Sequence, residues 1–183
     1  MTRLHLVRHG QAAAGWGADH DPGLDDVGRA QAAAVAESLA PLGPLPIVVS
    51  PLRRTLETAG AFGDVWPDVV PRVDAAVGEI PSPTDDLASR EAWLVGVLAG
   101  RWADLDDALR GWRRDVVDAL LAMRDDTVVV THFVAINAAV GTATADDRLV
   151  CFRPDNCSVT VLEHDGSALR VVEFGAERGT AVL

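Results

Sequence analysis

The chain has 183 residues, of which 49% are hydrophobic and 23% are charged, so it can bury one core and we expect a single domain over residues 1–183. The formal net charge of −11 argues against nucleic-acid and membrane partners, because such binding depends on Lys and Arg that neutralise phosphates. No apolar run approaches the ~18 residues that span a bilayer and no signal peptide is recognised, so we expect a cytoplasmic protein with free thiols at Cys151 and Cys157.

The first half of the chain predicts two strand–helix pairs. An apolar run over 3–7 predicts a strand, and residues 11–23, rich in Gly, Ala and Asp, predict a loop. Asp25 is placed to cap a helix over 26–39. A β-branched run over 46–50 predicts a second strand, followed by a helix over 52–62 that ends at Gly63. Residues 64–86 contain prolines and predict a connection with a short strand near Val69 and Val70.

The second half predicts two helices, a central strand, a further helix and a hairpin. Asp85 and Asp86 offer a cap for a helix that reaches about Gly100, and apolar residues at spacings of three and four predict a helix over 104–123. The most apolar β-branched run, 127–131, predicts a central strand, and residues 135–140 predict a helix that ends at Gly141. Strands over 158–163 and 169–174 flank an Asp-Gly turn at 165–166. The alternation of strands and helices predicts an α/β sandwich with a mixed sheet.

Reactive side chains follow several of the predicted strands. Arg8 and His9 follow the first strand, the segment Ser50-Pro51-Leu52-Arg53-Arg54 follows the second, and His132 follows the central strand. Ligands of open α/β sheets bind beyond the carboxyl ends of the strands, so we expect these residues to converge on one anion site. Glu79, in the connection before the next helix, adds a carboxyl group.

This set of residues suits phosphoryl transfer through a histidine. The reaction needs an uncharged imidazole nitrogen directed at phosphorus, and fixed positive charge on the phosphoryl oxygens. It also needs a proton donor for the leaving alkoxide, a role that a carboxyl group of raised pKa can fill. Two histidines, two or three arginines and a glutamate supply all three without a metal or another cofactor.

The chain resembles the histidine phosphatase superfamily, in its phosphoglycerate-mutase-like branch. The resemblance covers about residues 3–163 and rests on motifs in the family's order, which are Leu6-Val7-Arg8-His9-Gly10-Gln11, Leu24 to Ala32, Ser50 to Ala59, Val130-Thr131-His132, and Asn156-Cys157-Ser158-Val159. It implies a three-layer α/β/α sandwich with a mostly parallel mixed sheet, in which residues 80–126 form a short helical insert beside the site.

The resemblance also implies a role for each matched residue. His9 would become phosphorylated, and Arg8, Arg54 and His132 would hold the phosphoryl group, with Arg54 rather than Arg53 in the phosphate-binding place. Glu79 would act as general acid and then base. The first motif also places Gln11 among the phosphate-binding residues.

Several positions depart from the family pattern. Ala12 stands where many relatives have Thr or Ser, and Phe133 replaces a glycine after the second histidine, so its ring should line the pocket. The segment after Glu79 lacks the continuation found in mutases, which leaves Asp85, Asp86 or Glu91 as alternative proton donors. Trp16 and His20 lie in the loop beside the site, whereas we expect His164, next to the Asp-Gly turn, at the surface.

We therefore expect a metal-independent phosphatase that acts through a phosphohistidine at His9, on a small phosphate ester or a phosphoprotein. One alternative is a phosphoglycerate-type mutase, which the short segment between Glu79 and His132 disfavours. The other is a protein phosphohistidine phosphatase, since small bacterial members of that kind also have alanine after the first motif. The sequence does not indicate an oligomeric state.

Overall fold

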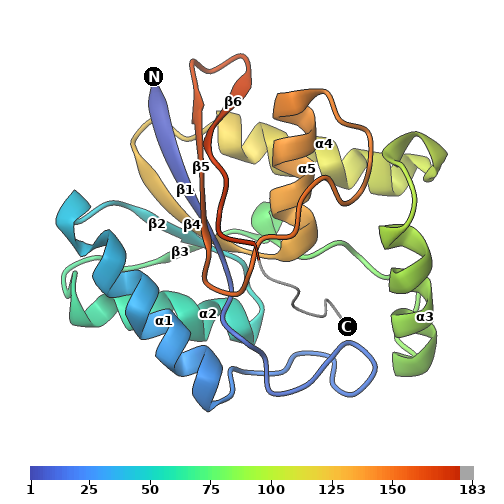
Figure 1. The fold of residues 1–183 in the computed structure, drawn as a ribbon, viewed down its shortest axis with the longest axis horizontal. Helices are drawn as coiled ribbons and strands as arrows, with labels where there is room; N and C mark the ends of the chain where they lie inside the picture. Colours follow the sequence, from blue (N-terminus) through green and yellow to red (C-terminus); the bar gives the residue numbers. More distant parts are fainter. Residues whose placement is uncertain (178–183) are drawn as a thin grey trace.

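A computed structural model describes residues 1–177 and contains a six-stranded mixed sheet in the order β3-β2-β4-β1-β5-β6 (Figure 1). The strands are β1 (Thr2–Arg8), β2 (Ile47–Val49), β3 (Arg72–Val73), β4 (Thr127–Thr131), β5 (Val159–His164) and β6 (Leu169–Glu173). β1, β2 and β3 run parallel to their neighbours in the β3-β2-β4-β1 part of the sheet, and β5 joins β1 in antiparallel register. The sheet is therefore mostly parallel with an antiparallel edge, as predicted.

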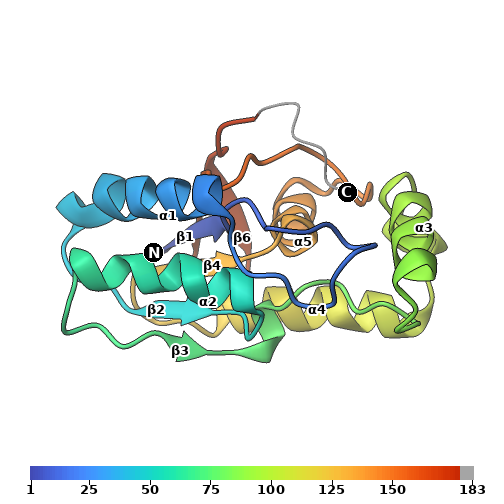
Figure 2. The same cartoon turned by 90° about the horizontal axis from the view of Figure 1, so that it is seen from below.

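Helices cover both faces of this sheet, which makes the three-layer α/β/α sandwich that the resemblance implies (Figure 2). The α-helices are α1 (Asp26–Leu39), α2 (Arg53–Gly60), α3 (Leu87–Leu98), α4 (Asp107–Leu121) and α5 (Phe133–Thr144). α1 and α2 pack on one face and α4 and α5 on the other. Successive residues of β4 serve the two faces in turn, because Val128 and Val130 contact the first layer and Val129 the second.

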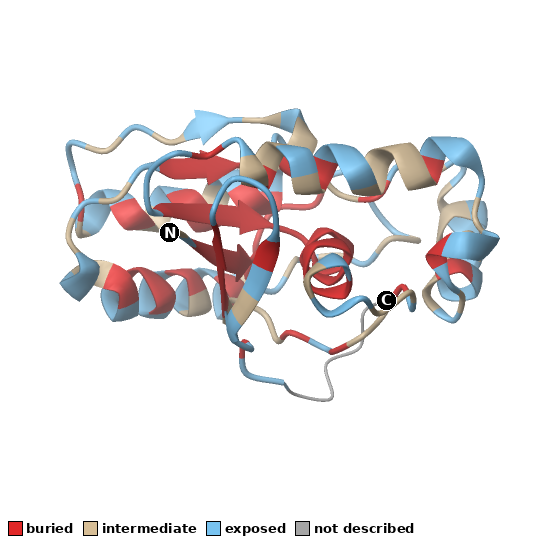
Figure 3. Cartoon of the chain, turned by 90° about the horizontal axis from the view of Figure 1, so that it is seen from above, coloured by how far each residue is buried: buried red, intermediate tan, exposed pale blue. Residues whose placement is uncertain are grey.

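The burial pattern explains why the strands are so apolar. Every residue of β4 is buried, since the strand lies in the interior of the sheet with helices on both sides (Figure 3). α4 buries one side, through Leu109, Val116 and Leu120. No helix within residues 1–177 is long and apolar enough to cross a membrane.

Two predicted helix caps are confirmed. Asp25 accepts a hydrogen bond from the Gly28 amide at the start of α1, and Asp86 accepts one from the Ser89 amide at the start of α3. The predicted hairpin is also present, because residues 165–168 join β5 to β6 and Gly166 has the positive φ of 94° that the turn needs.

Other predicted boundaries are wrong. The short third strand lies at Arg72–Val73 instead of Val69 and Val70. α4 begins at Asp107 because Asp106 caps it, and a separate 3₁₀ turn covers Trp102–Asp104. α2 continues as a 3₁₀ turn through Gly63. α5 begins at Phe133 and passes through Gly141, because burial of nearly the whole helix outweighs the low helix propensity of a single glycine; it ends where Ala145 adopts a left-handed conformation.

The prediction that His164 lies at the surface is also wrong. The side chain is only 2% exposed, although the adjacent turn is solvated. Its Nδ1 accepts a hydrogen bond from the Gly166 amide at 3.0 Å, so the ring packs back under the hairpin it belongs to. A local turn signal does not reveal such a contact, because the contact depends on the direction in which the last side chain of the strand points.

Candidate active site

Strand register brings three site segments to one edge of the sheet. Arg8 pairs with Thr131, and Val49 pairs with Val130, so the residues that follow these strands emerge side by side. The amide of His9 donates to the Thr131 carbonyl, which fixes the exit of β1 against that of β4. The predicted convergence of the strand exits is confirmed.

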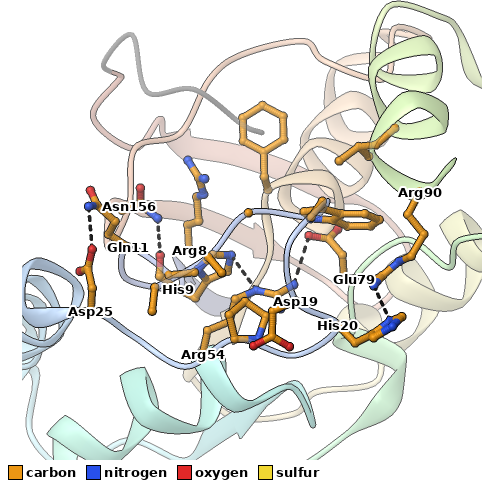
Figure 4. Close-up of a pocket in the computed structure, with 18 of the residues that line it drawn as sticks. Arg8, His9, Gln11, Asp19, His20, Asp25, Arg54, Glu79, Arg90 and Asn156 are labelled. Carbon is orange, nitrogen blue, oxygen red and sulfur yellow. Dashed lines mark hydrogen bonds and ion pairs between the residues drawn. The ribbon is translucent and has the colours of Figure 1, made fainter. Parts of the chain in front are cut away.

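His9 is oriented so that its lone pair lies on Nε2, where it accepts a hydrogen bond from Nε of Arg54. Its Nδ1 lies 2.8 Å from the Gly10 carbonyl oxygen, which can only accept, so Nδ1 carries the proton. Nε2 therefore has the lone pair, and it lies 3.2 Å from Nε of Arg54. Asn156 donates from Nδ2 to the His9 carbonyl at 2.9 Å and fixes the backbone at this point (Figure 4). This arrangement presents Nε2 to the cavity.

A close backbone contact accounts for the glycine after His9. A Cβ atom at Gly10 would lie 2.5 Å from the carbonyl oxygen of Gly28 at the start of α1. The Gly10 amide instead donates to the Thr58 hydroxyl of α2 at 3.0 Å. The loop after β1 is therefore clamped between α1 and α2, and only glycine fits there.

Arg54, and not Arg53, points into the site. The Arg54 side chain is 7% exposed, and its NH2 group lies 3.2 Å from Nδ1 of His132 and 3.9 Å from Oε2 of Glu79. Arg53 is 67% exposed and pairs with Glu57 one turn further along α2. The two neighbours lie on different sides of the helix, so the choice made from the motif agrees with the geometry.

His132 is fully buried between two hydrogen-bonding partners. Guanidinium groups only donate, so Nδ1 accepts from Arg54 and the ring proton resides on Nε2. Nε2 donates to the hydroxyl of Ser50 at 2.7 Å. The rings of His9 and His132 meet edge to face, with centroids 5.3 Å apart. Arg54 thus sets the tautomer of His132 and Ser50 fixes the orientation of the ring, a role that sequence reasoning missed although Ser50 begins the second arginine motif.

The guanidinium group of Arg8 lines the site and is contacted by a backbone carbonyl and an aromatic ring. NH1 donates to the Pro154 carbonyl at 2.9 Å, and the guanidinium lies 5.3 Å from the ring centroid of Phe133. Phe133 also lines the cavity, as predicted from its replacement of a glycine.

Glu79 belongs to the same cluster. Its side chain is 9% exposed, Oε1 accepts from the Ile80 amide at 2.9 Å, and Oε2 lies 3.6 Å from Nδ1 of His132. Burial raises the pKa of this carboxyl group, while the positive charges of Arg54 and Arg8 act in the opposite direction. None of the alternative donors considered from the sequence is among the cavity-lining residues, and Asp86 is engaged as the cap of α3.

Burial has the reverse effect on the two histidines. It lowers the pKa of His9 well below the ordinary value, and the charges of Arg54 and Arg8 lower it further. The pKa of His132 is lowered by the same causes together with His9. Both rings are therefore neutral at pH 7, and the site combines uncharged imidazoles with fixed guanidinium charge.

Gln11 lies at the rim, where its amide is already engaged. Nε2 donates to Asp25, the cap of α1, at 2.8 Å, so the side chain supports the helix start as well as lining the cavity. Figure 4 shows Gln11 beside Asp25 at the edge of the site, with Glu79 and Arg90 on the opposite side. Its predicted contact with phosphate stays a prediction.

The cavity has a volume of about 550 Å³ and extends beyond the residues predicted from the motifs. Its outer part is lined by Trp16, Asp19, His20, Arg90 and Leu94. Trp16 was expected beside the site, His20 was expected mainly as a solvated loop residue, and Arg90 was missed because no motif marks it. Within residues 1–177 no group of three His, Cys, Asp or Glu side chains is arranged to hold a metal ion.

The fold and the site define a class of α/β protein with a buried histidine–arginine cluster at the carboxyl ends of its parallel strands. Residues 4–84 match the family model of the histidine phosphatase superfamily (branch 1). Over 96% of this chain and 99% of the other, the structure resembles the native mycobacterial glucosyl-3-phosphoglycerate phosphatase, with a TM-score of 0.70 and 26% identity. The chain therefore resembles the histidine phosphatase superfamily, in sequence over residues 4–84 and in its overall fold.

Other relatives agree with this placement. A glucosyl-3-phosphoglycerate phosphatase of Mycolicibacterium vanbaalenii is 50% identical over 35% of this chain and 30% of its own length. An uncharacterized protein of Mycobacterium tuberculosis is 36% identical over 56% of this chain and 50% of its own length, so the chain spans half the length of these curated relatives or less. The Entamoeba histolytica phosphoserine phosphatase with bound 3-phosphoglyceric acid has the same fold, with a TM-score of 0.74 and 20% identity over 97% of this chain and 98% of that one.

Proposed function

We propose that this protein is a phosphatase that hydrolyses a phosphate ester through a phosphohistidine on His9. The observation that carries the proposal is the lone pair of His9 Nε2, which lies 3.2 Å from Arg54 in a cluster that also holds His132 and a carboxyl group of raised pKa. A neutral nucleophile, fixed positive charge and a protonated acid are the three elements of phosphoryl transfer to histidine.

In the first step, Nε2 of His9 forms a bond to phosphorus while the bond from phosphorus to the ester oxygen breaks. Arg8 and Arg54 stabilise the charge on the phosphoryl oxygens, His132 holds Arg54 in position through Nδ1, and Gln11 contacts the phosphoryl oxygens from the rim. The leaving oxygen takes its proton from Glu79, so the alcohol departs neutral and Glu79 becomes a carboxylate.

In the second step, Glu79 takes a proton from water as the water oxygen attacks phosphorus. The bond from phosphorus to His9 breaks, the ring regains its lone pair, and inorganic phosphate leaves. Glu79 is protonated again and the cycle is complete. The low pKa of His9 keeps the nitrogen unprotonated before the attack.

The substrate class we propose is a small phosphate ester. The names of the relatives refer to glucosyl-3-phosphoglycerate and phosphoserine, both of them small esters of phosphate. A cavity of about 550 Å³ is of a size that suits such a ligand.

Replacement of the nucleophile tests the proposal. His9→Ala should lower the rate of phosphate release by at least ~10⁴-fold, because the nucleophile is lost and Nδ1 of the fully buried His132, which accepts from Arg54, cannot replace it. Far-UV circular dichroism should be unchanged, and EDTA should not inhibit the native protein. Full activity in His9→Ala, or activity that depends on an added divalent metal, would contradict this mechanism.

The same assay separates the two alternative reactions. A mutase incubated with 3-phosphoglycerate would produce isomeric phosphoglycerate instead of free phosphate. A phosphohistidine phosphatase would release phosphate from a phosphohistidine peptide and not from alkyl esters.

A further inference from the structure

The outer wall of the cavity is built by the loop over 11–23 and by α3. Trp16 of the loop packs against Trp93 of α3, with ring centroids 6.5 Å apart. Gly17 lies so close to α3 that a Cβ atom there would come within 2.1 Å of Oε2 of Glu91. The loop and the helix therefore form one packed unit opposite the strand ends.

Arg90 is the cation of this outer wall. Its guanidinium lies 5.0 Å from the centroid of the Trp16 ring, and NH1 donates to Nδ1 of His20 at 2.9 Å. Among residues 1–177 no carboxylate oxygen lies within ion-pair distance of Arg90, unlike Arg54, which has Glu79 and Asp21 nearby. The indole thus holds a guanidinium group whose charge is not balanced by the protein at short range.

The contact with Arg90 also determines what His20 can offer. Because the guanidinium can only donate, Nδ1 of His20 accepts and the proton of the neutral ring resides on Nε2. His20 lines the cavity and is exposed, so Nε2 provides a second donor beside Arg90. Figure 4 shows the pair on the side of the cavity that faces away from Gln11 and Asn156.

Arg90 shares the cavity with the phosphate-binding arginines. Burial lowers the pKa of the Arg54 guanidinium, the charges of Glu79 and Asp21 oppose this, and the positive charge of Arg90 lowers it further. Three acidic residues line the cavity: Glu79 belongs to the strand-end cluster, Asp25 caps α1, and Asp19 accepts from the Asp21 amide at 3.0 Å. The cavity therefore has two cationic ends, one at the strand exits and one at Arg90.

We propose that Arg90 and His20 bind a second anionic group of the substrate, a carboxylate or a phosphate, while the strand-end cluster binds the phosphoryl group that is transferred. The inference rests on the proposed function for the identity of the first group. It narrows the substrate class to small phosphate esters that carry a further anionic group a few bonds from the ester oxygen.

Binding to the His9→Ala protein tests the second site without depending on turnover. Two pairs of ligands isolate the anionic group. 3-Phosphoglycerate and glycerol 3-phosphate differ only in a carboxylate against a hydroxymethyl group, and propane-1,3-diyl bisphosphate and 3-hydroxypropyl phosphate differ only in the second phosphate. In at least one pair, calorimetry should show that the ligand with the second anionic group binds ~10- to 100-fold more tightly than the ligand without it. This is the gain expected for a charge-assisted contact.

Variants of the outer wall then assign the gain to Arg90. Arg90→Gln in the same background should reduce the affinity ratio of that pair to below threefold, with most of the loss in the ligand that carries the second anionic group. Arg90→Lys should retain part of the ratio, because the charge remains and the planar fork is lost. Arg114→Gln, an exposed arginine of α4 outside this cavity, should leave the ratio unchanged.

The outcomes are distinct for the two proposals. Equal affinities within both pairs, no measurable binding of any of the four ligands, or a ratio that survives Arg90→Gln would overturn the second anion site. If the ratio depends on Arg90 but the native protein releases no phosphate from any of these esters, the second site stands and the proposed hydrolysis is wrong.

Discussion

The strand-end wall and the outer wall of the cavity are built on different principles. At the strand ends, Arg8, His9, Arg54 and His132 are all buried, and each is hydrogen-bonded to the backbone or to another member of the cluster. On the outer wall, Trp16 and Arg90 are half-buried and His20 is exposed. Under the proposed function, this contrast assigns phosphoryl transfer to the buried wall, whose side chains are held rigidly, and substrate selection to the outer wall, whose side chains meet solvent.

The largest effect on kcat/KM is expected at the strand-end wall, where two neighbouring arginines can be compared. Arg54→Ala should lower kcat/KM roughly 100- to 1000-fold, because it removes fixed charge from the transferred phosphoryl group. Arg53→Ala is the matched control, since Arg53 is exposed and pairs with Glu57, and it should change kcat/KM by less than about threefold. Steady-state kinetics measures both, and a larger loss in Arg53→Ala would reverse the assignment.

Glu79 tests whether the buried carboxyl group acts as the acid. Glu79→Gln should lower kcat roughly 100-fold for an alkyl phosphate and much less for p-nitrophenyl phosphate, whose leaving group needs no proton. The acid works when protonated, so kcat/KM of the native protein should fall as pH rises through the raised pKa of Glu79. This alkaline fall should be absent in Glu79→Gln. If Glu79→Gln leaves kcat unchanged for alkyl and aryl esters alike, Glu79 is not the acid, and a phosphohistidine substrate is favoured.

The smallest effect is expected where one residue acts through another. Ser50→Ala leaves the buried Nε2–H of His132 without its acceptor, so kcat should fall about tenfold and the free energy of unfolding by about 1–3 kcal/mol. Ser50→Thr keeps the hydroxyl and should restore kcat, which a purely space-filling role would not require. Ser38→Ala, which removes a hydroxyl from α1 on another part of the molecule, is the control for both measurements.

Local signals account for the parts of the fold that the sequence predicted well. Asp25 and Asp86 cap their helices because a short carboxylate before a helix can reach its free amides, a property of a few neighbouring residues. The end of α5 was predicted wrongly at Gly141, because it does not depend on neighbouring residues alone. Packing against the sheet extends the helix to Thr144, and packing is not visible in the residues of the helix alone.

The sequence by itself determined the alternation of strands and helices and the residues that follow each parallel strand, and hence the approach of His9, His132 and the segment 50–54. That much follows from periodicity and chain order, because parallel strands end at one edge of a sheet, whereas the choice of Arg54 over Arg53 came from the family resemblance. Only the tertiary structure decided that Ser50 orients His132 and that Arg90 contacts His20 on the outer wall of the cavity. These contacts join residues 82 and 70 positions apart, and their existence depends on how loops and helices pack around the sheet.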